Sequence, residues 1–245
     1  MDKKHISQHI SKQFNEELED IRYKVLSMGG LVEQQLEMAM KSFKTGDTEL
    51  AEQVIRNDSQ INELESVIDK ECMQILALRQ PAAFDLRLLI ACIKMIPELE
   101  RIGDKASRIA HMTVQLFDND SGKRDEYYEV QHLSELVMAM LYDSLDAFAR
   151  LSLDNILAIN EQEKVVNREY SAIVRQLITK MLEDPRNITR SLDVLTVSKA
   201  LERVADLSCN LCEYVIYMML GEDVRHISSD ELTEKLEKRK HKDSQ

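Results

Sequence analysis

Residues that interrupt helices are scarce in this sequence, and their scarcity limits what the chain can fold into. Its 245 residues include only 6 Gly and 3 Pro, no Trp, and 5% aromatic residues. A sheet protein would need more turn-forming and aromatic side chains than this, whereas long helices with polar surfaces do not. We therefore predict an all-α protein, long enough for one large domain or two small ones.

The few breakers divide the chain into six predicted helices. Gly46 fits the left-handed residue that often follows a helix, and Asp47 or Thr48 can cap the next one. Pro81 suits the first turn of the third helix, and Gly29–Gly30 is a weak point within the first. We expect five helices at about 6–44, 48–78, 81–117, 126–150 and 154–182. After a break at 183–187, a sixth helix is expected to run to about residue 220.

A polar, Gly-containing linker at residues 118–125 separates three predicted helices from three others, which indicates a duplication. Phe43 matches Phe148 at an offset of 105 residues, and the offset falls to 102 in the third helix of each half. A repeat of about 100 residues is too long for a solenoid unit. We predict two tandem pseudo-symmetric three-helix bundles, 1–117 and 126–220, followed by a short charged tail at 221–245.

Charge and targeting signals narrow the classes of function. With 44 acidic and 32 basic residues, the chain has a formal net charge of −12. It would repel phosphate backbones, so we expect no nucleic-acid partner. No apolar run resembles a signal peptide or a membrane span, and the four cysteines lack dense spacing, so we expect a cytoplasmic protein. We interpret Cys209-x-x-Cys212 as small buried hydrophobes rather than a metal or redox pair.

Two acidic pairs recur at equivalent places in the two halves: Glu100 with Asp104, and Glu202 with Asp206. Each pair has the i, i+4 spacing that stacks like charges on one helix face, at a cost of about 0.2–0.5 kcal/mol. On a helical wheel both pairs lie away from the apolar face. A hard cation held between the carboxylates would relieve the repulsion. His111 and Glu213 extend the two acidic stripes.

The second helix of each half supplies a further candidate pair. Asp58 with Asn62, and Glu163 with Asn167, repeat an acid and an amide at the same spacing, and amide oxygens can also bind hard cations. The competing interpretation is a solvated surface crossed by salt bridges. This interpretation predicts an ion pair between Asp104 and Arg108 in the first half. In the second half, the only basic partner that it offers Asp206 is Arg203.

Several segments together resemble the PhoU family of phosphate-transport regulators. They are "RQPAAFDLR", "ELERIGDKASRIA", "EDPRNITR" and "LERVADLSCNLCEYVIYMMLGEDVRH", and the likeness runs from about His5 to His226. The resemblance implies paired three-helix bundles with metal clusters on the surface. Its motifs fall on Glu100, Asp104, Glu202 and Asp206, and more loosely on Asp58, Asn62, Glu163 and Asn167. The metal would be a divalent or trivalent ion such as Fe, Zn, Mn or Mg.

The resemblance also implies a role. Such a protein is a cytoplasmic negative regulator that links the ATPase subunit of the phosphate-specific ABC transporter to a membrane sensor histidine kinase, and it meets the membrane through these partners. It is not an enzyme, which agrees with the absence of a nucleophile with a base or a Gly-rich phosphate loop. A homodimer is expected. The chain departs from the family pattern at Asn167, Ala205, Leu207 and Arg108.

Two alternatives remain at this stage. A carboxylate-bridged di-iron protein would need two Glu-x-x-His motifs facing a bundle core, and the sequence offers Glu129-x-x-His132 without a partner. A metal-free helical adaptor would use the acids as a docking face. In the tail, Ser228 with Glu231 predicts a capping box and a short helix, within an end that we expect to be frayed.

Overall fold

The computed structural model describes residues 12–117, 127–224, 227 and 231–235, and within them it contains α-helices, one short 3-10 helix and no strands. This confirms the predicted all-α class. The helices are α1 (Lys12–Thr45), α2 (Thr48–Arg79), α3 (Ala83–Phe117), α4 (Tyr128–Arg150), α5 (Ile156–Glu183) and α6 (Ile188–Leu220), and the 3-10 helix η2 (Pro185–Asn187) precedes α6.

The ends of several helices follow from local residue chemistry. Gly46 takes a φ of 64° after α1, and the Asp47 carboxylate accepts a hydrogen bond of 2.9 Å from the Leu50 backbone amide. Both features were predicted. The placement of Pro81 in the first turn of α3 was wrong, because Gln80 ends α2 in the left-handed conformation and the chain needs two more residues before α3 begins.

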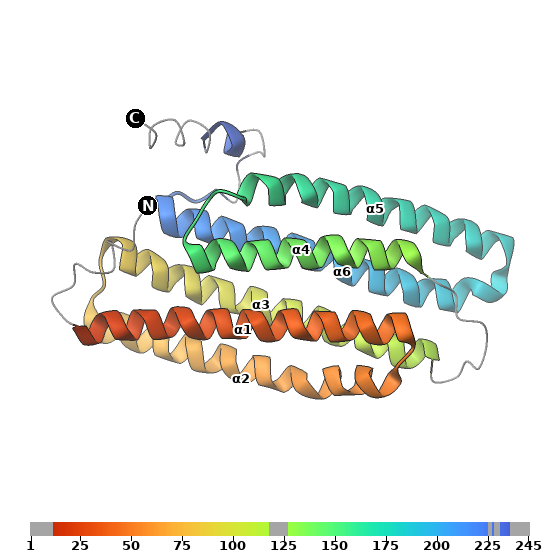
Figure 1. The fold of residues 1–245 in the computed structure, drawn as a ribbon, viewed down its shortest axis with the longest axis horizontal. Helices are drawn as coiled ribbons and strands as arrows, with labels where there is room; N and C mark the ends of the chain where they lie inside the picture. Colours follow the sequence, from red (N-terminus) through yellow and green to blue (C-terminus); the bar gives the residue numbers. More distant parts are fainter. Residues whose placement is uncertain (1–11, 118–126, 225–226, 228–230, 236–245) are drawn as a thin grey trace.

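The helices form two three-helix bundles side by side, α1–α3 and α4–α6 (Figure 1). At the centre α3 and α6 pack antiparallel, since Arg87 near the start of α3 donates to the Met218 carbonyl at 2.9 Å, while Gln115 near its end donates to Asp193 at 3.3 Å. The predicted linker at 118–125 lies outside the described residues. The arrangement agrees with the tandem bundles that the repeat indicated.

A single hydrophobic core runs through both bundles. Phe43 and Phe148, which the repeat pairs, are 2% and 0% exposed. The weak point expected at Gly29–Gly30 is absent, because α1 continues through it. A β-carbon at Gly29 would lie 2.7 Å from Leu145 Cδ2 of α4, so the missing side chain lets the two bundles approach closely.

The chain after α6 returns to the second bundle. Val224 and Leu232 are 4% and 6% exposed, and Ile227 packs against the core. Residues 231–235 are helical, as predicted, whereas Ser228 of the proposed capping box lies outside the described residues. The expectation of a frayed end from residue 228 onward is wrong for Leu232, because this apolar side chain is buried.

Candidate functional site: two acidic faces

The first acidic face brings together Asp58 of α2 and the pair Glu100 and Asp104 of α3. Gly103 allows this approach, because a β-carbon there would lie 2.9 Å from Ile61 Cδ1 and 3.8 Å from an Asp58 carboxylate oxygen. Burial raises the pKa of Asp58 and of Glu100, and the charge of Asp104 raises both further. The structure therefore joins three of the predicted residues from two helices.

His111, Asn62 and Glu65 lie around the first acidic face in different ways. His111 is exposed, yet its charge lowers the pKa of Asp58, which places it near that carboxylate. Glu65 raises the pKa of Glu100 and was missed by the sequence analysis, although it lies seven residues after Asp58, two turns along the same face. Asn62 is exposed.

The second acidic face is formed by Glu163 of α5 and by Glu202 and Asp206 of α6. Burial raises the pKa of Glu163, and the charges of Asp206 and Glu202 raise it further, while a hydrogen bond from the Cys209 thiol lowers it. Burial and the charge of Glu202 likewise raise the pKa of Asp206. The motif residues of the second half thus converge as those of the first half do.

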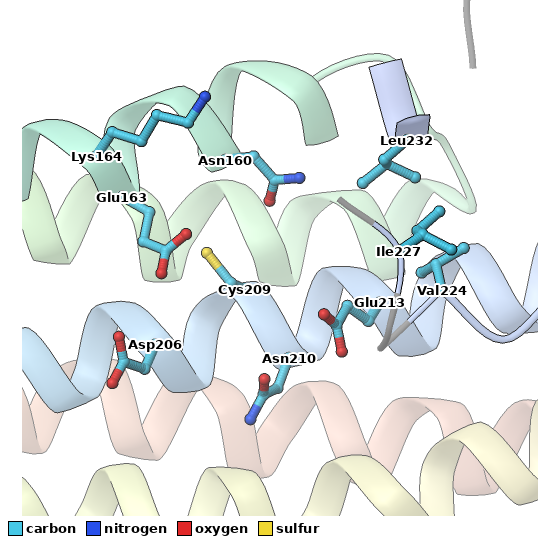
Figure 2. A pocket seen from close by; sticks show the side chains of 10 residues that line it. All are labelled: Asn160, Glu163, Lys164, Asp206, Cys209, Asn210, Glu213, Val224, Ile227 and Leu232. Carbon is cyan, nitrogen blue, oxygen red and sulfur yellow. The ribbon is translucent and has the colours of Figure 1, made fainter. Parts of the chain in front are cut away.

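A pocket of about 340 Å³ opens beside this second face (Figure 2). Glu163 and Cys209 approach each other across it from α5 and α6, and Glu213 lies farther along α6. Asn167, the other amide predicted as a ligand, is exposed and does not line the pocket. The lining residues are Asn160, Glu163, Lys164, Asp206, Cys209, Asn210, Glu213, Val224, Ile227 and Leu232.

The two faces differ in how their charges are balanced. In the second, Lys199 lies 2.6 Å from a Glu202 carboxylate oxygen, and Arg203 lies 2.9 Å from Asp206. Among the residues that the structure describes, no such ion pair reaches Asp58, Glu100 or Asp104. The predicted Asp104–Arg108 pair is not formed, because Arg108 acts instead on Asp193 of α6. The first face is therefore the less neutralised one.

The donor groups do not form a completed metal centre. Within residues 12–117, 127–224, 227 and 231–235, no three His, Cys, Asp or Glu side chains converge closely enough to hold one ion. Glu129 and His132, the candidate di-iron motif, are both exposed on α4, and Glu129 accepts a hydrogen bond from Gln176. An inward-facing di-iron site therefore does not use this motif.

The cysteines divide into two kinds. Cys212 is buried in the core, as the sequence predicted, but Cys209 is only half-buried and faces the pocket. Burial raises the pKa of both thiols, to about 12 for Cys212, and the charge of Glu163 adds to the effect at Cys209. Both thiols are free. Cys209 is thus a pocket residue that its spacing from Cys212 did not reveal.

Glu98 is a further polar residue that sequence reasoning missed. It is 6% exposed and lies where α3 meets α6, and it accepts hydrogen bonds from Asn210 at 3.3 Å and from the Tyr214 hydroxyl at 3.4 Å. Arg101 pairs with it at 3.2 Å. These contacts link the two bundles and satisfy a buried carboxylate. Their partners come from the other half of the chain, so no local motif marks them.

Comparisons with known proteins decide the family. The PhoU domain model matches residues 25–113 and again residues 130–215, once in each bundle. The chain belongs to the PhoU family. It is 46% identical to the "Phosphate-specific transport system accessory protein PhoU homolog" of Pseudomonas aeruginosa, over 97% of this chain and 98% of that one. To the Escherichia coli (strain K12) accessory protein PhoU it is 43% identical, over 95% of each chain.

Solved PhoU structures share the fold. The crystal structure of PhoU from Pseudomonas aeruginosa superposes with a TM-score of 0.81 at 46% identity, covering 85% of this chain and 100% of that one. The regulatory protein PhoU from Streptococcus pneumoniae gives a TM-score of 0.78 at 30% identity, covering 86% and 99%. The resemblance inferred from sequence is therefore confirmed, and the family is one of regulatory accessory proteins rather than enzymes.

Among the helices that the structure describes, none has a stretch both long and apolar enough to cross a membrane.

Replacing Glu163 by Gln is expected to stabilise the PhoU protein at pH 7. An acid whose pKa is raised by folding contributes stability only while it is protonated, and that stability is lost as pH rises through the raised value. Glu163→Gln should therefore gain about 0.2–1 kcal/mol at pH 7, the range typical of partly exposed charge interactions, or up to roughly 4 °C in Tm, and nothing at pH 4. Thermal unfolding at both pH values tests this.

The matched control is Glu161→Gln, which removes an exposed carboxylate paired with Lys164 at 2.6 Å. This variant should gain no stability at pH 7, because its acid is solvated and paired. An equal gain in both variants would attribute the effect to net charge rather than to the second acidic face.

Proposed function

We propose that this protein is a negative regulator of the phosphate-starvation response, coupling the ATPase subunit of a phosphate-specific ABC transporter to a sensor histidine kinase. The observation that carries the proposal is the PhoU match in both bundles, together with relatives named accessory proteins of the phosphate-specific transport system. The site chemistry supports it, because the two acidic faces offer charged contact surfaces and no arrangement for catalysis.

The two bundles suit a linking role. Their acidic faces lie on separate helix pairs, α2 with α3 and α5 with α6, so one molecule can present two surfaces at once. The shared core and the Glu98 contacts hold those surfaces in a fixed relation. We propose that the protein works in the cytoplasm and meets the membrane through its partners, with a homodimer as the active form.

Capture of partners from cell membranes tests the proposed link. The tagged protein should retain the transporter ATPase and the histidine kinase, with amounts that differ between high and low phosphate. A variant carrying Glu100→Lys and Asp104→Lys should lose at least one partner, because the reversed charges oppose docking. The matched control carries Glu161→Lys and Glu183→Lys, the same change in net charge at exposed acids elsewhere. Retention of neither partner by the parent protein would contradict the proposal.

We also propose that the acidic faces bind divalent or trivalent metal ions, such as Fe, Zn, Mn or Mg. No three of these side chains are close enough to hold one ion as they stand, so Asp58, Glu100 and Asp104 would have to draw together around an ion at the first face, and Glu163, Glu202 and Asp206 at the second. Carboxylates are suitable donors for hard cations. Burial, and after it the neighbouring acidic charges, raise the pKa of Glu100 and of Asp206, and a cation would offset both effects. A bound ion would supply positive charge to these faces.

The charges around the two donor sets predict which face binds a metal ion more tightly. Lys199 and Arg203 already neutralise Glu202 and Asp206, so the first face should bind an ion more tightly. Asn62 and Asn167 are exposed and lie outside both donor sets, whereas His111 lies near Asp58 and Glu213 lines the pocket beside the second face.

Alanine at Glu100, Asp104, Glu202 and Asp206 together is expected to abolish bound metal without unfolding the helices, since none of these four residues belongs to the hydrophobic core. Elemental analysis of the purified protein, with circular dichroism as the control for folding, measures this. The variant lacking only Glu100 and Asp104 should lose more metal than the one lacking only Glu202 and Asp206. If the fourfold variant keeps its full metal content, the adaptor function must be explained without these ions.

A further inference from the structure

Two pockets open between α1 and α2, which lie antiparallel along one edge of the molecule (Figure 1). Their volumes are about 270 Å³ and about 50 Å³. Ile21 of α1 and Ile75 of α2 line the larger pocket, and Gln35 of α1 and Ile61 of α2 line the smaller one. On each helix the two residues are fourteen positions apart, which is close to four turns and about 21 Å. The pockets therefore lie on the same side of the helix pair, in what we call the α1–α2 groove.

The larger pocket has an apolar floor and an exposed apolar rim. Ile21 and Ile75 are buried beneath it, whereas Leu78, which also lines it, is 78% exposed. Val67 is 46% exposed and lies four residues before Glu71, another lining residue, so it faces the same side of α2. An apolar side chain that entered this pocket would be covered by the two isoleucines and by Leu78.

The smaller pocket contains a buried polar group that lacks a hydrogen bond. Gln35 is 5% exposed, and its Oε1 atom has no hydrogen-bond partner among the residues that the structure describes. Leaving such an atom unpaired costs free energy, which a ligand that supplied the missing partner would recover. Gln34, Asn57 and Gln60 line the same pocket. Its polar lining thus consists of uncharged amides, which suit an uncharged polar side chain such as that of Ser, Thr, Asn or Gln.

The charge around the groove favours a basic ligand. Together α1 and α2 carry 13 acidic and 8 basic residues. Near the larger pocket, Lys24 lies 2.7 Å from Asp20 and 2.6 Å from Glu71, and Arg79 lies 2.5 Å from Glu17. These basic groups are therefore engaged by acids of the chain itself, and the helix pair keeps an acidic excess. A segment with basic residues along its edges would be attracted to this excess.

We propose that the α1–α2 groove binds an amphipathic α-helix of a partner protein. The helix places an apolar side chain in the larger pocket and an uncharged polar side chain in the smaller one, and it carries basic residues along its edges. Two side chains fourteen residues apart on one helix share a face and are separated by about 21 Å, which matches the spacing of the pockets. A helix laid between two packed helices buries its apolar stripe as in a helical bundle. The proposal goes beyond the regulatory function and does not depend on it.

Crosslinking in cells that contain the full chain identifies the occupant. The photoreactive residue p-benzoylphenylalanine replaces Leu78 in the groove. As the matched control it replaces Leu182, which is 80% exposed near the end of α5. After illumination, the crosslinked peptides are identified by mass spectrometry. The probe at position 78 should capture one segment of another protein, with apolar residues at helical spacing and an excess of Lys and Arg. The probe at position 182 should not capture that segment.

Binding of the captured segment to the full chain then tests the two pockets separately. The segment is synthesised as a peptide, and its affinity is measured by fluorescence anisotropy. Leu78→Ser and Gln35→Met should each weaken binding at least tenfold, whereas Leu182→Ser should not change it. Gln35→Met should also raise the Tm of the free chain by about 2–4 °C, because it removes a buried unpaired polar atom. Its weaker binding would therefore not result from unfolding.

Several results would overturn the proposal. One is that the probe in the groove captures no more than the probe on α5. Another is that the captured segment belongs to a second copy of this chain, is acidic, or stays non-helical by circular dichroism when bound. The third is that either groove variant keeps the parental affinity; for Gln35→Met this would mean that water, rather than the partner, satisfies the buried amide.

Discussion

Deletion of the gene for this PhoU protein is expected to switch on phosphate-starvation genes in phosphate-rich medium. If the protein is an inhibitory link, its presence keeps the kinase in a repressing state, so its loss should free the response from phosphate control. The expected change is from near silence to the level seen under starvation. A reporter for a starvation-induced gene, measured in high phosphate with and without the protein, gives the result directly.

The control is complementation of the deletion with variants. The parent protein should restore silence, and so should the control carrying Glu161→Lys and Glu183→Lys. The variant carrying Glu100→Lys and Asp104→Lys should not, provided that it is folded and present at the same level. Cells without the protein should also accumulate phosphate and grow poorly unless the transporter is lost as well. A reporter that stays silent after deletion, or that loses only its induction under starvation, would show that the fold serves another purpose.

Phe148→Ala is expected to cause the largest loss of stability among the variants considered. The Phe148 side chain is fully buried in α4, and removing a buried aromatic ring costs about 3–5 kcal/mol because a cavity remains. In a chain of this size each kcal/mol lowers Tm by roughly 2–4 °C. We therefore expect Tm to fall by about 10 °C, measured by circular dichroism or calorimetry.

The number of unfolding transitions tests whether the two bundles unfold together. The core is continuous across both bundles, so Phe148→Ala and Phe43→Ala should each lower one common transition. Tyr142→Ala, at a 60% exposed aromatic of the same helix as Phe148, should change Tm by less than about 1–2 °C. If each Phe variant shifts a separate transition, the bundles unfold independently and the shared core does not couple them.

Helix boundaries were predictable where a single residue decides them. Gly46 adopts the left-handed conformation at low cost, and Asp47 satisfies an amide at the start of α2, so both act locally. Gln80 and Leu151 also end helices in the left-handed conformation, but neither residue type marks such a position. Leu151 is held by packing against the core and by hydrogen bonds to carbonyls of α4, which makes this end a tertiary effect.

The acidic pairs were predictable for a similar reason. Four-residue spacing places Glu100 beside Asp104, and Glu202 beside Asp206, whatever the helices pack against. The doubling within the chain then identified Asp58 and Glu163 as residues of the same kind. Their charge balance was not predictable. Arg108 was assigned to Asp104 by spacing, yet the neighbouring α6 presents Asp193 to it.

The sequence by itself determined the helices, their grouping by threes, the family and the acidic motifs, because each depends on residues close together or on a repeat within one chain. Only the tertiary structure decided which residues from different helices meet. The absence of a side chain at Gly103 lets α2 bring Asp58 to Glu100. The antiparallel packing of α3 and α6 buries Glu98 against Asn210, more than 100 residues away. The burial of Val224 and Leu232 brings both side chains into the lining of the pocket that Cys209 also lines. These contacts arise from burial and shape across the whole fold, which no local pattern of residue types encodes.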